Sequence, residues 1–366
     1  MFGGVCYRFA EAADEACIKK LLRDNSMSSW VAISTEHEPS YFASSALFGR
    51  RRTMIARDAC DDAPIGMASY VVMPVYCNGR TVSGGYLGEL RVFPEFRNRL
   101  RVIRNGYNAI AALSDSIGGA PRWFTSIAKE NSSAKRLLEA NLKGMPAYTP
   151  VGEMQTRALS VNKGKHQNVM RQATSTDIAR VAKFYSQSAS QYQFAPAITE
   201  SWLRSLDGRH GLRLEDFWLL EENGRLRASF AIWDQQLLKQ TVVRGYRFPL
   251  SKLRVVYNGY AGVTGRVVLP KVGGHIQYAF IAFLATEDNG SDISLSVINS
   301  ALALVKARQL PIAMLGTASG NPVARVLERI PSELYETTIY SVAWPEAVET
   351  PPPLDGRLVQ PEIAIL

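Results

Sequence analysis

Four arginines, Arg97, Arg99, Arg101 and Arg104, follow one another closely after Pro94. The neighbouring residues indicate a strand that turns through this basic loop into a helix. At a helix N-terminus the first N–H groups have no partner within the helix, and the helix dipole favours an anion. Nearby arginines add positive charge, so the stretch is suited to hold phosphate.

The strand that must position this loop is the run Tyr86–Phe93, which is rich in leucine, aromatic and β-branched residues and ends at Pro94. Strict alternation predicts two residues on one face, Leu90 and Val92, and three on the other, Glu89, Arg91 and Phe93. The helix predicted after the loop places apolar residues at helical spacing, at Ile103, Tyr107, Ile110 and Ala111.

Within this stretch the pattern V-x-P-x-aromatic-R consists of Val92, Pro94, Phe96 and Arg97. It resembles the acetyl-CoA-binding motif of the GNAT N-acetyltransferase superfamily. The resemblance implies that cofactor binds at the strand end and in the loop, and that six loop residues wrap the CoA pyrophosphate. The strand-end residues are Leu90, Arg91 and Val92, and the six loop residues are Arg97, Asn98, Arg99, Leu100, Arg101 and Val102.

The loop departs from the family pattern at two positions. The family usually has glycine at the fourth position and glycine or alanine at the sixth, where the backbone must come close to phosphate. This chain has Leu100 and Val102 there. Backbone N–H groups do not depend on side-chain identity, so the resemblance still implies CoA binding, with weaker contacts.

A second motif follows the next predicted strand, Trp123–Ala128. The family has N-x-x-A at the start of the next helix, and Asn131 and Ala134 fit it as further cofactor-binding residues. The same residues also fit a simple helix N-cap and a good helix former. A tyrosine that the family often carries as general acid is replaced by Leu138. Two other tyrosines, Tyr107 and Tyr148, are substitutes in principle.

Glu89 is the candidate catalytic residue. An amine that attacks a thioester must lose a proton, and a carboxylate near the cleft is the usual base, directly or through water. The alternative is a half-exposed strand carboxylate paired with a neighbour such as Arg91. A strand bulge would change the face that Glu89 occupies, so both interpretations stay open.

Composition and length indicate a globular protein of two domains: the chain has 366 residues, 46% of them apolar and 20% charged. No apolar run approaches the roughly 20 residues that span a bilayer. The N-terminal sequence lacks the features of a signal peptide. We therefore expect a cytoplasmic protein without a membrane partner.

The net charge of +9 favours anionic partners. An acidic cofactor such as CoA would use this charge, and we do not expect a nucleic acid because the Lys and Arg residues are dispersed without a reader motif. The four cysteines and four histidines are scattered and form no CxxC pair. We expect neither a metal site nor a disulfide framework.

The second half of the chain repeats the order of the first. The stretch from Arg171 to Asp177 parallels Arg8 to Asp14, and an N-x-x-A at Asn321 and Ala324 echoes the one at Asn131. We predict two tandem domains, residues 1–160 with the acyl-CoA site and residues 161–366 as a degenerate copy. Aligning the two central strands puts Phe283 in the place of Glu89, and Ser291 in the place of Arg97, within an acidic loop at 287–292.

Two further segments belong to the second domain. The basic, Gly- and Pro-punctuated stretch at about 239–274 is an insertion that could cover the acceptor cleft, contact an anion or simply pack. The tail contains the prolines 351–353 and a predicted edge strand, Glu362–Leu366.

The sequence thus predicts an α/β chain of two tandem GNAT-like domains with mixed sheets. The resemblance implies transfer of an acyl group, foremost acetyl from acetyl-CoA, to a primary amine of a small molecule or peptide. Two alternatives are a non-catalytic acyl-CoA-binding sensor and a long-chain N-acyltransferase. The sequence leaves the acceptor and the oligomeric state open.

Overall fold

The computed structural model describes residues 4–25, 30–44, 48–97, 99–115, 122–164, 169–287, 291–345 and 351–366. Asn98 of the predicted phosphate loop lies outside these residues. No helix in these ranges is both long and apolar enough to cross a bilayer.

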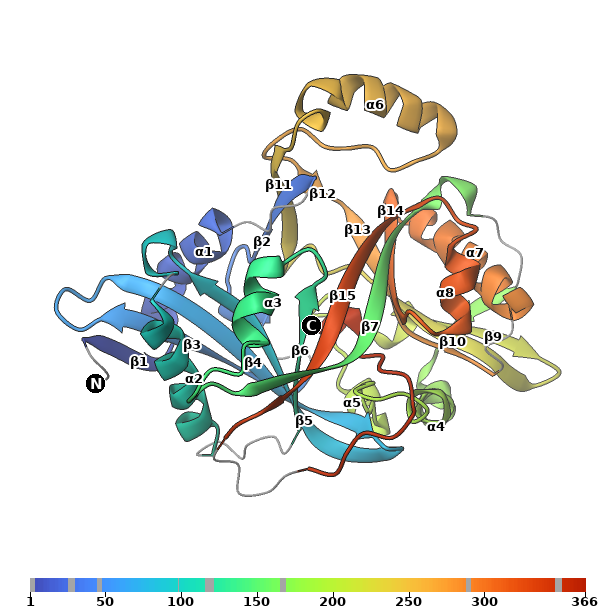
Figure 1. Ribbon diagram of the computed structural model, residues 1–366. Helices are drawn as coiled ribbons and strands as arrows, with labels where there is room; N and C mark the ends of the chain where they lie inside the picture. The colour runs from blue at the N-terminus through green and yellow to red at the C-terminus, as the bar shows by residue number, and fades with distance from the viewer. Residues whose placement is uncertain are drawn as a thin grey trace.

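One mixed sheet of twelve strands runs through the molecule (Figure 1). In spatial order its strands are β1 (Val5–Phe9), β3 (Arg50–Asp58), β4 (Pro64–Cys77), β5 (Arg80–Val92), β6 (Arg122–Ala128), β15 (Ser332–Ala343), β7 (Ala147–Ser160), β14 (Ile312–Ala318), β13 (Tyr278–Thr286), β10 (Arg225–Trp233), β9 (Phe217–Glu222) and β8 (Met170–Gln172). The predicted mixed α/β architecture is confirmed.

The two halves of the sheet mirror one another. Each half has an antiparallel series followed by one parallel pair, β5 with β6 and β13 with β14. The strand that closes each half comes from the other end of the chain: β7 pairs with β14, and β15 pairs with β6. The halves are therefore joined by exchange of their last strands as well as by the central β7–β15 pairing.

Helices occupy both faces of each half. The first half has α1 (Glu15–Asp24), α2 (Leu100–Asp115) and α3 (Ser132–Leu138), and the second has α4 (Ile178–Ala189), α5 (Glu200–Arg204), α7 (Ser291–Ala307) and α8 (Pro322–Leu327). In the second half α4 and α7 bury their apolar sides in two different core clusters, on opposite faces of the sheet. Burial of these faces, and not local propensity, is what holds such short helices.

The predicted repeat is visible in one local contact that both halves share. Arg8 donates two hydrogen bonds to the Asp14 carboxylate, and Arg171 does the same to Asp177. Each aspartate also accepts from a backbone N–H three residues earlier and so caps the turn that leads into α1 or α4.

The predicted insertion forms a separate small unit. Strands β12 (His275–Ile276) and β11 (Gln240–Tyr246) join β2 (Val31–Glu36) of the first half in a three-stranded sheet. Helix α6 (Leu250–Thr264) lies beyond it, at the top of Figure 1. The insertion thus connects the second half to the segment that follows β2.

The prediction of an edge strand in the tail is wrong. Residues Ile363–Ile365 form a 3-10 turn. The main-chain oxygens of Ala364 and Leu366 accept hydrogen bonds from the side chains of Gln235 and Lys239, and such long-range contacts are not reported by local pattern.

We predict that Asp14→Asn destabilises the protein by about 3 kcal/mol, because a charged partner of Arg8 and Arg57 is lost from a site that is 1% exposed. Burial alone would raise the pKa of Asp14, but the hydrogen bonds from Arg8, Glu11 N–H and Arg57 hold that pKa to about 2. The wild type therefore has a larger free energy of unfolding than Asp14→Asn at pH values above the ordinary pKa of about 4. This difference disappears as pH falls through about 2. Urea unfolding at several pH values measures it.

The matched control is Asp62→Asn, which removes an Arg57 partner that is 77% exposed. We expect a change within about 0.5 kcal/mol for this variant. Equal losses in both variants would contradict the role given to Asp14.

Candidate active site

A β-bulge at Glu89 breaks the alternation of strand β5. Between Ser69↔Gly88 and Met67↔Arg91 the strand carries one residue more than its partner β4. Glu89 has a φ of +51°, a left-handed conformation that is unusual for a residue other than glycine. The simple two-face pattern predicted for Glu89 to Phe93 is therefore wrong from this point.

The strands on either side of the bulge diverge. Parallel pairing of β5 with β6 covers only Gly84–Tyr86 against Arg122–Phe124, and ends three residues before Glu89. From there β6 continues its pairing with β15. Directly beyond the pairing, the Leu87 carbonyl oxygen of β5 accepts a hydrogen bond from the Thr125 side chain of β6 at 2.7 Å, so a side chain replaces the backbone ladder there.

The bulge directs the Glu89 carboxylate towards a cluster of polar side chains that come from three other segments of the chain. Arg51 of β3 forms an ion pair with it, the Tyr41 hydroxyl donates a hydrogen bond at 2.7 Å, and His37 Nε2 lies at 3.4 Å. Thr53 shares a hydrogen bond with the same Tyr41 hydroxyl at 2.7 Å. Glu89 is paired with Arg51 and not with the neighbouring Arg91.

These contacts set the protonation states of the cluster. Burial alone would raise the pKa of Glu89, but the charge of Arg51 and the hydrogen bond from His37 hold it well below its ordinary value. Burial lowers the pKa of His37, and the Glu89 carboxylate offsets this only in part. At neutral pH the site therefore holds an ionised carboxylate against a neutral imidazole.

The second half of the chain reaches this cluster through Lys239. Its ammonium donates to the main-chain oxygen of Leu366 at 3.0 Å. Burial lowers the pKa of Lys239, while the Glu89 charge opposes and the Arg51 charge reinforces that shift. Lys239 directly precedes β11, so the start of the insertion lies beside Leu366 and close enough to Glu89 to feel its charge.

The predicted phosphate loop leads from β5 into the start of α2. The Arg97 side chain donates to the Val92 carbonyl oxygen at 3.2 Å and to the Asn25 amide oxygen at 2.6 Å. The Arg99 guanidinium lies over the Phe96 ring, 4.8 Å from its centroid. Both arginines are exposed, and the helix begins directly after them, at Leu100.

The other predicted loop and strand residues differ in burial. Val102 is buried against Ala56 and Ile65, so its side chain packs into the core, whereas Arg101 is exposed. On the strand, Leu90 is 40% exposed, and Arg91 and Val92 are half-buried. A side chain larger than glycine at position 102 is thus accommodated inside the protein.

The N-x-x-A residues cap helix α3. The Asn131 side chain accepts a hydrogen bond from the Ala134 N–H at 3.1 Å, and Ala134 packs against the core. Leu138 is buried in the same core cluster. Tyr107 and Tyr148 bond to each other there, and burial raises the pKa of each, to about 12 for Tyr107.

The second half repeats the bulge with a different side chain. Phe283 has a φ of +53°, and the β13–β14 pairing also ends three residues earlier, at Phe280. The Phe283 ring lies among aromatic side chains and stacks on Phe217 and Trp233. Where the first half has a carboxylate cluster, the second half has apolar core. Of the predicted acidic loop, residues 288–290 and the side chains of Ser291 and Asp292 lie outside the description.

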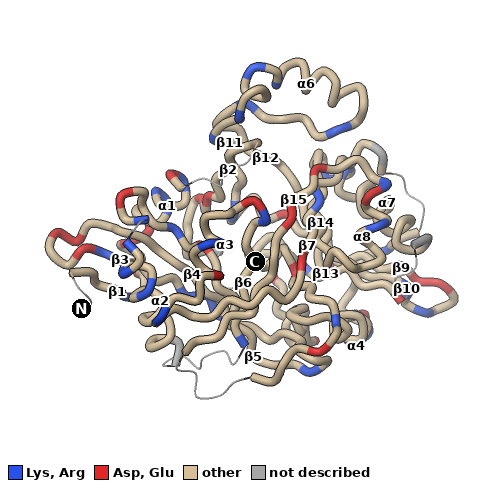
Figure 2. Tube along the Cα trace, viewed as in Figure 1, with Lys and Arg blue, Asp and Glu red and all other residues tan. Residues whose placement is uncertain are grey.

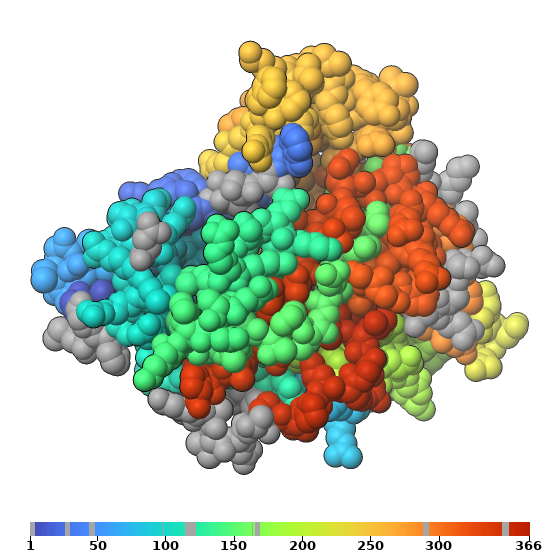
Figure 3. Space-filling model, in the orientation of Figure 1, coloured from blue at the N-terminus to red at the C-terminus, as the bar shows by residue number. Residues whose placement is uncertain are grey.

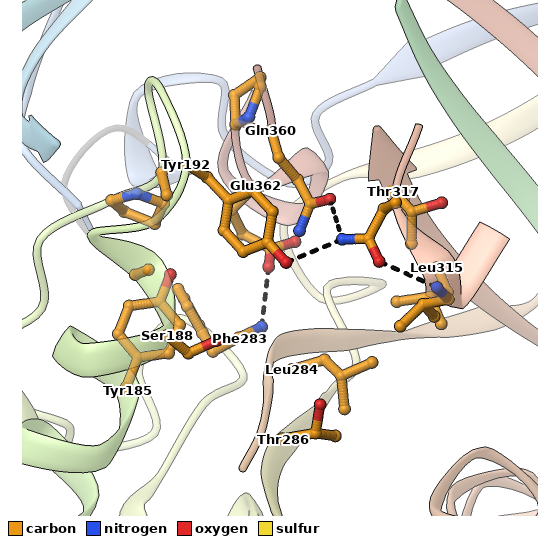
Figure 4. A pocket seen from close by; sticks show the side chains of 17 residues that line it. Tyr185, Ser188, Tyr192, Phe283, Leu284, Thr286, Leu315, Thr317, Gln360 and Glu362 are labelled. Atoms are coloured by element: carbon orange, nitrogen blue, oxygen red, sulfur yellow. Dashed lines mark hydrogen bonds between the residues drawn. The ribbon is translucent and has the colours of Figure 1, made fainter. Parts of the chain in front are cut away.

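The tail of the chain lines a pocket at this second bulge, together with residues of α4, β13 and β14 (Figure 4). The Glu362 carboxylate accepts from the Phe283 N–H at 2.8 Å and from the Ala364 N–H at 3.1 Å. The Gln360 side-chain oxygen accepts from the Ala318 N–H and from the Asn321 amide, at 2.9 and 2.7 Å. Side chains of the tail thus accept hydrogen bonds from the polar groups that are exposed where β13 and β14 separate.

Three members of the first cluster escape sequence reasoning. His37, Tyr41 and Arg51 lie on separate segments, at least 38 residues before Glu89 in the chain. The pattern around each is ordinary: one histidine after a strand, one tyrosine in a turn, one arginine in a basic run. Only the three-dimensional arrangement identifies them.

No protein-family model matches the sequence, and no curated protein sequence matches it. Solved structures do match. N-myristoyltransferase from Saccharomyces cerevisiae with bound myristoyl-CoA has a TM-score of 0.61 at 10% identity, over 93% of this chain and 83% of that chain. A second structure of that enzyme with myristoyl-CoA gives 0.60 at 10%, over 93% and 78%. A GCN5-related N-acetyltransferase from Anabaena variabilis gives 0.48 at 10%, over 92% and 72%, and no argument rests on it.

The chain has a tandem GNAT fold. The match to the yeast enzyme runs through both halves, so the second domain expected from the internal repeat is part of the same architecture. At 10% identity this likeness shows the fold and leaves the reaction to be argued from the site.

We predict that Glu362 makes the protein less stable as pH rises. Burial raises the pKa of Glu362 to about 7, while the bonds from Phe283 and Ala364 oppose the shift. A raised pKa stabilises the folded state below the ordinary value of about 4.3, and the contribution is lost as pH rises through about 7. In Glu362→Gln this part of the pH dependence, at most about 3 kcal/mol, should vanish.

Thermal unfolding of both proteins from pH 4.5 to 8 measures the difference. Glu328→Gln, at an exposed position on the end of α8, serves as control and should retain the wild-type profile. Parallel profiles for wild type and Glu362→Gln would contradict the assignment.

Proposed function

We propose that this protein is an acyl-CoA-dependent N-acyltransferase with one active site per chain, in the first half. The amine of the acceptor attacks the thioester carbonyl, a C–N bond forms, the C–S bond breaks, and CoA leaves and takes up a proton. The observation that carries the proposal is the Glu89 bulge beside separating strands, with a polar cluster on one side and a basic loop at the strand end.

The second half supports the use of the first bulge as a hydrogen-bond donor to an oxygen outside the sheet. There the N–H of the bulged residue, Phe283, donates to a carboxyl oxygen of Glu362. Glu89 has nearly the same φ and the same relation to its neighbouring strands. We assign to the Glu89 N–H the equivalent task, a hydrogen bond to the thioester oxygen as negative charge develops on it.

Proton transfer is assigned to the His37–Glu89 pair. Glu89 alone is a weak base because Arg51 holds its pKa low, whereas His37 is neutral and can accept a proton. A carboxylate against an imidazole stabilises the imidazolium that forms, as in other nucleophile-activating pairs. In this role Glu89 positions the base and balances its charge.

For the acyl donor we propose an acyl-CoA, with Arg97, Asn98, Arg99 and the N–H groups through Val102 at the pyrophosphate and Asn131 and Ala134 nearby. The sequence favours acetyl-CoA, while the tandem fold shared with a myristoyl-CoA-bound enzyme favours a long acyl chain. Thiol release from acetyl-, octanoyl- and myristoyl-CoA, with a panel of primary amines and peptides as acceptors, distinguishes the two. The proposed domain boundary at 160/161 and a cytoplasmic location belong to the same proposal.

We predict that one equivalent of acyl-CoA binds per chain, because Gln360 and Glu362 already bond the polar groups beside the second bulge. Arg97→Ala should weaken binding by about 10- to 100-fold, the loss expected for one charge-assisted contact to phosphate. Native mass spectrometry counts the equivalents, and calorimetry measures the dissociation constant.

Arg325→Ala, which removes an exposed charge from α8 of the second half, is the control and should bind as wild type does. Two equivalents would show that the tail does not exclude cofactor, and an unchanged affinity in Arg97→Ala would refute the pyrophosphate placement.

We predict that His37→Gln and Glu89→Gln each lower kcat by about 10²- to 10⁴-fold, the usual contribution of proton transfer. Affinity for acyl-CoA should change by no more than a few-fold, because neither side chain is placed at the pyrophosphate. Steady-state kinetics and binding measured on the same preparations separate the two effects.

Tyr41→Phe is the matched control, since it removes one hydrogen bond to Glu89 and leaves the Arg51 ion pair in place. A loss of about tenfold or less is expected for that variant. Acyl-CoA binding without turnover for any donor and amine would favour the non-catalytic sensor instead.

A further inference from the structure

Helix α6 and its flanking residues, 247–272, form a crest that projects from the body of the molecule (Figure 3). The crest joins the rest of the fold through β11 and β12 of the small sheet. Its residues take no part in the Glu89 cluster or in the tail contacts at Phe283.

The inner side of α6 is held by the returning chain. The Asn258 amide exchanges two hydrogen bonds with the main chain of Leu269, each at 2.9 Å, and Arg254 donates to the same carbonyl oxygen at 3.2 Å. Ala261 is fully buried on this side. These contacts fix the face that α6 turns away from the protein.

That outward face is apolar. Leu253, Val256, Tyr260 and Val263 follow one another at intervals of three and four residues and so form one stripe, with exposed fractions of 50%, 70%, 54% and 89%. A helix on the surface of a water-soluble protein normally presents polar residues there. Further exposed apolar side chains flank the stripe, at Phe248, Val255, Val268 and Val272.

The charge of the crest is of one sign. Residues 239–275 contain seven Lys and Arg residues and no Asp or Glu. Lys239 and Arg244 are engaged at the base of the insertion, with Leu366 and Glu36. The exposed cations on the crest are Arg247, Lys252, Arg266 and Lys271, and Figure 2 shows basic positions but no acidic ones within the crest itself. Glu333 of β15, outside the crest, accepts a hydrogen bond from the Tyr257 hydroxyl at 3.5 Å.

We propose that this crest binds at the surface of an anionic lipid membrane, with the α6 stripe in the interface and the four cations against the headgroups. An outward apolar stripe gains free energy by burial among acyl chains, and each nearby Lys or Arg contributes about 1 kcal/mol at an anionic surface. A second copy of this chain fits less well, because it carries the same basic crest and a net charge of +9.

This inference departs from the expectation of no membrane partner. That expectation rested on the absence of a spanning segment, whereas interfacial binding needs only one exposed apolar face. It does not depend on the acyltransferase proposal, because the crest lies outside the Glu89 cluster.

Co-sedimentation of the full chain with vesicles tests the proposal. We expect binding to vesicles of 70% phosphatidylcholine and 30% phosphatidylserine, at least tenfold weaker binding to phosphatidylcholine alone, and weakening by 0.5 M NaCl. Val256→Asp with Val263→Asp should lower the affinity for the anionic vesicles at least tenfold. Lys252→Glu with Arg266→Glu should lower it as well.

Val169→Asp is the matched control, since Val169 is 93% exposed and far from the crest in sequence. It should leave vesicle binding unchanged. The crest substitutions are also at exposed positions, so melting temperatures should stay at the wild-type value, which excludes misfolding. Absence of binding to anionic vesicles, or equal binding by the wild type and the Val256/Val263 variant, would overturn the proposal. So would a dimer in sedimentation velocity that the same variant abolishes.

Discussion

The left-handed residue in the middle of a central strand is the constraint on which the rest of the site depends. A bulge bends its strand and interrupts the ladder, so the neighbouring parallel strand can no longer stay in register. In this chain the pairing ends three residues before the bulge in both halves. One backbone irregularity thus coincides with the end of the strand pairing and rotates a side chain out of the alternation of the sheet. In the second half it also directs the Phe283 N–H towards Glu362.

The two halves use the same irregularity for opposite purposes. At Glu89 the displaced side chain meets Arg51, His37 and Tyr41, and a charged site is formed. At Phe283 the displaced side chain completes an aromatic core, and the tail bonds the groups that the bulge exposes. Without Glu362 the Phe283 N–H would need another acceptor, because a buried donor without one costs free energy. Glu362 thus satisfies the donor that the second bulge exposes.

The motifs of the fold and of the candidate site could be predicted from the sequence where their residues are close together in the chain. The V-x-P-x-aromatic-R pattern, the N-cap at Asn131 and the Arg–Asp contacts of the repeat involve residues within seven positions of each other. His37 and Arg51 could not be found this way, because they meet Glu89 only through the pairing of β3 with β4 and the return of the chain after β2. The apolar stripe of α6 has regular helical spacing. The face of α6 that packs against the protein, however, is fixed by the contact between Asn258 and Leu269, which the sequence pattern does not reveal.

The exchange of closing strands makes the site at Glu89 depend on the second half of the chain. Strand β6, which pairs with β5, has β15 as its other neighbour, and β15 belongs to the end of the chain. Lys239 comes from the second half as well and reaches the vicinity of Glu89. Removing the second half would therefore expose the edge of β6 and take a cation from the site. The second half is therefore a structural part of the site at Glu89.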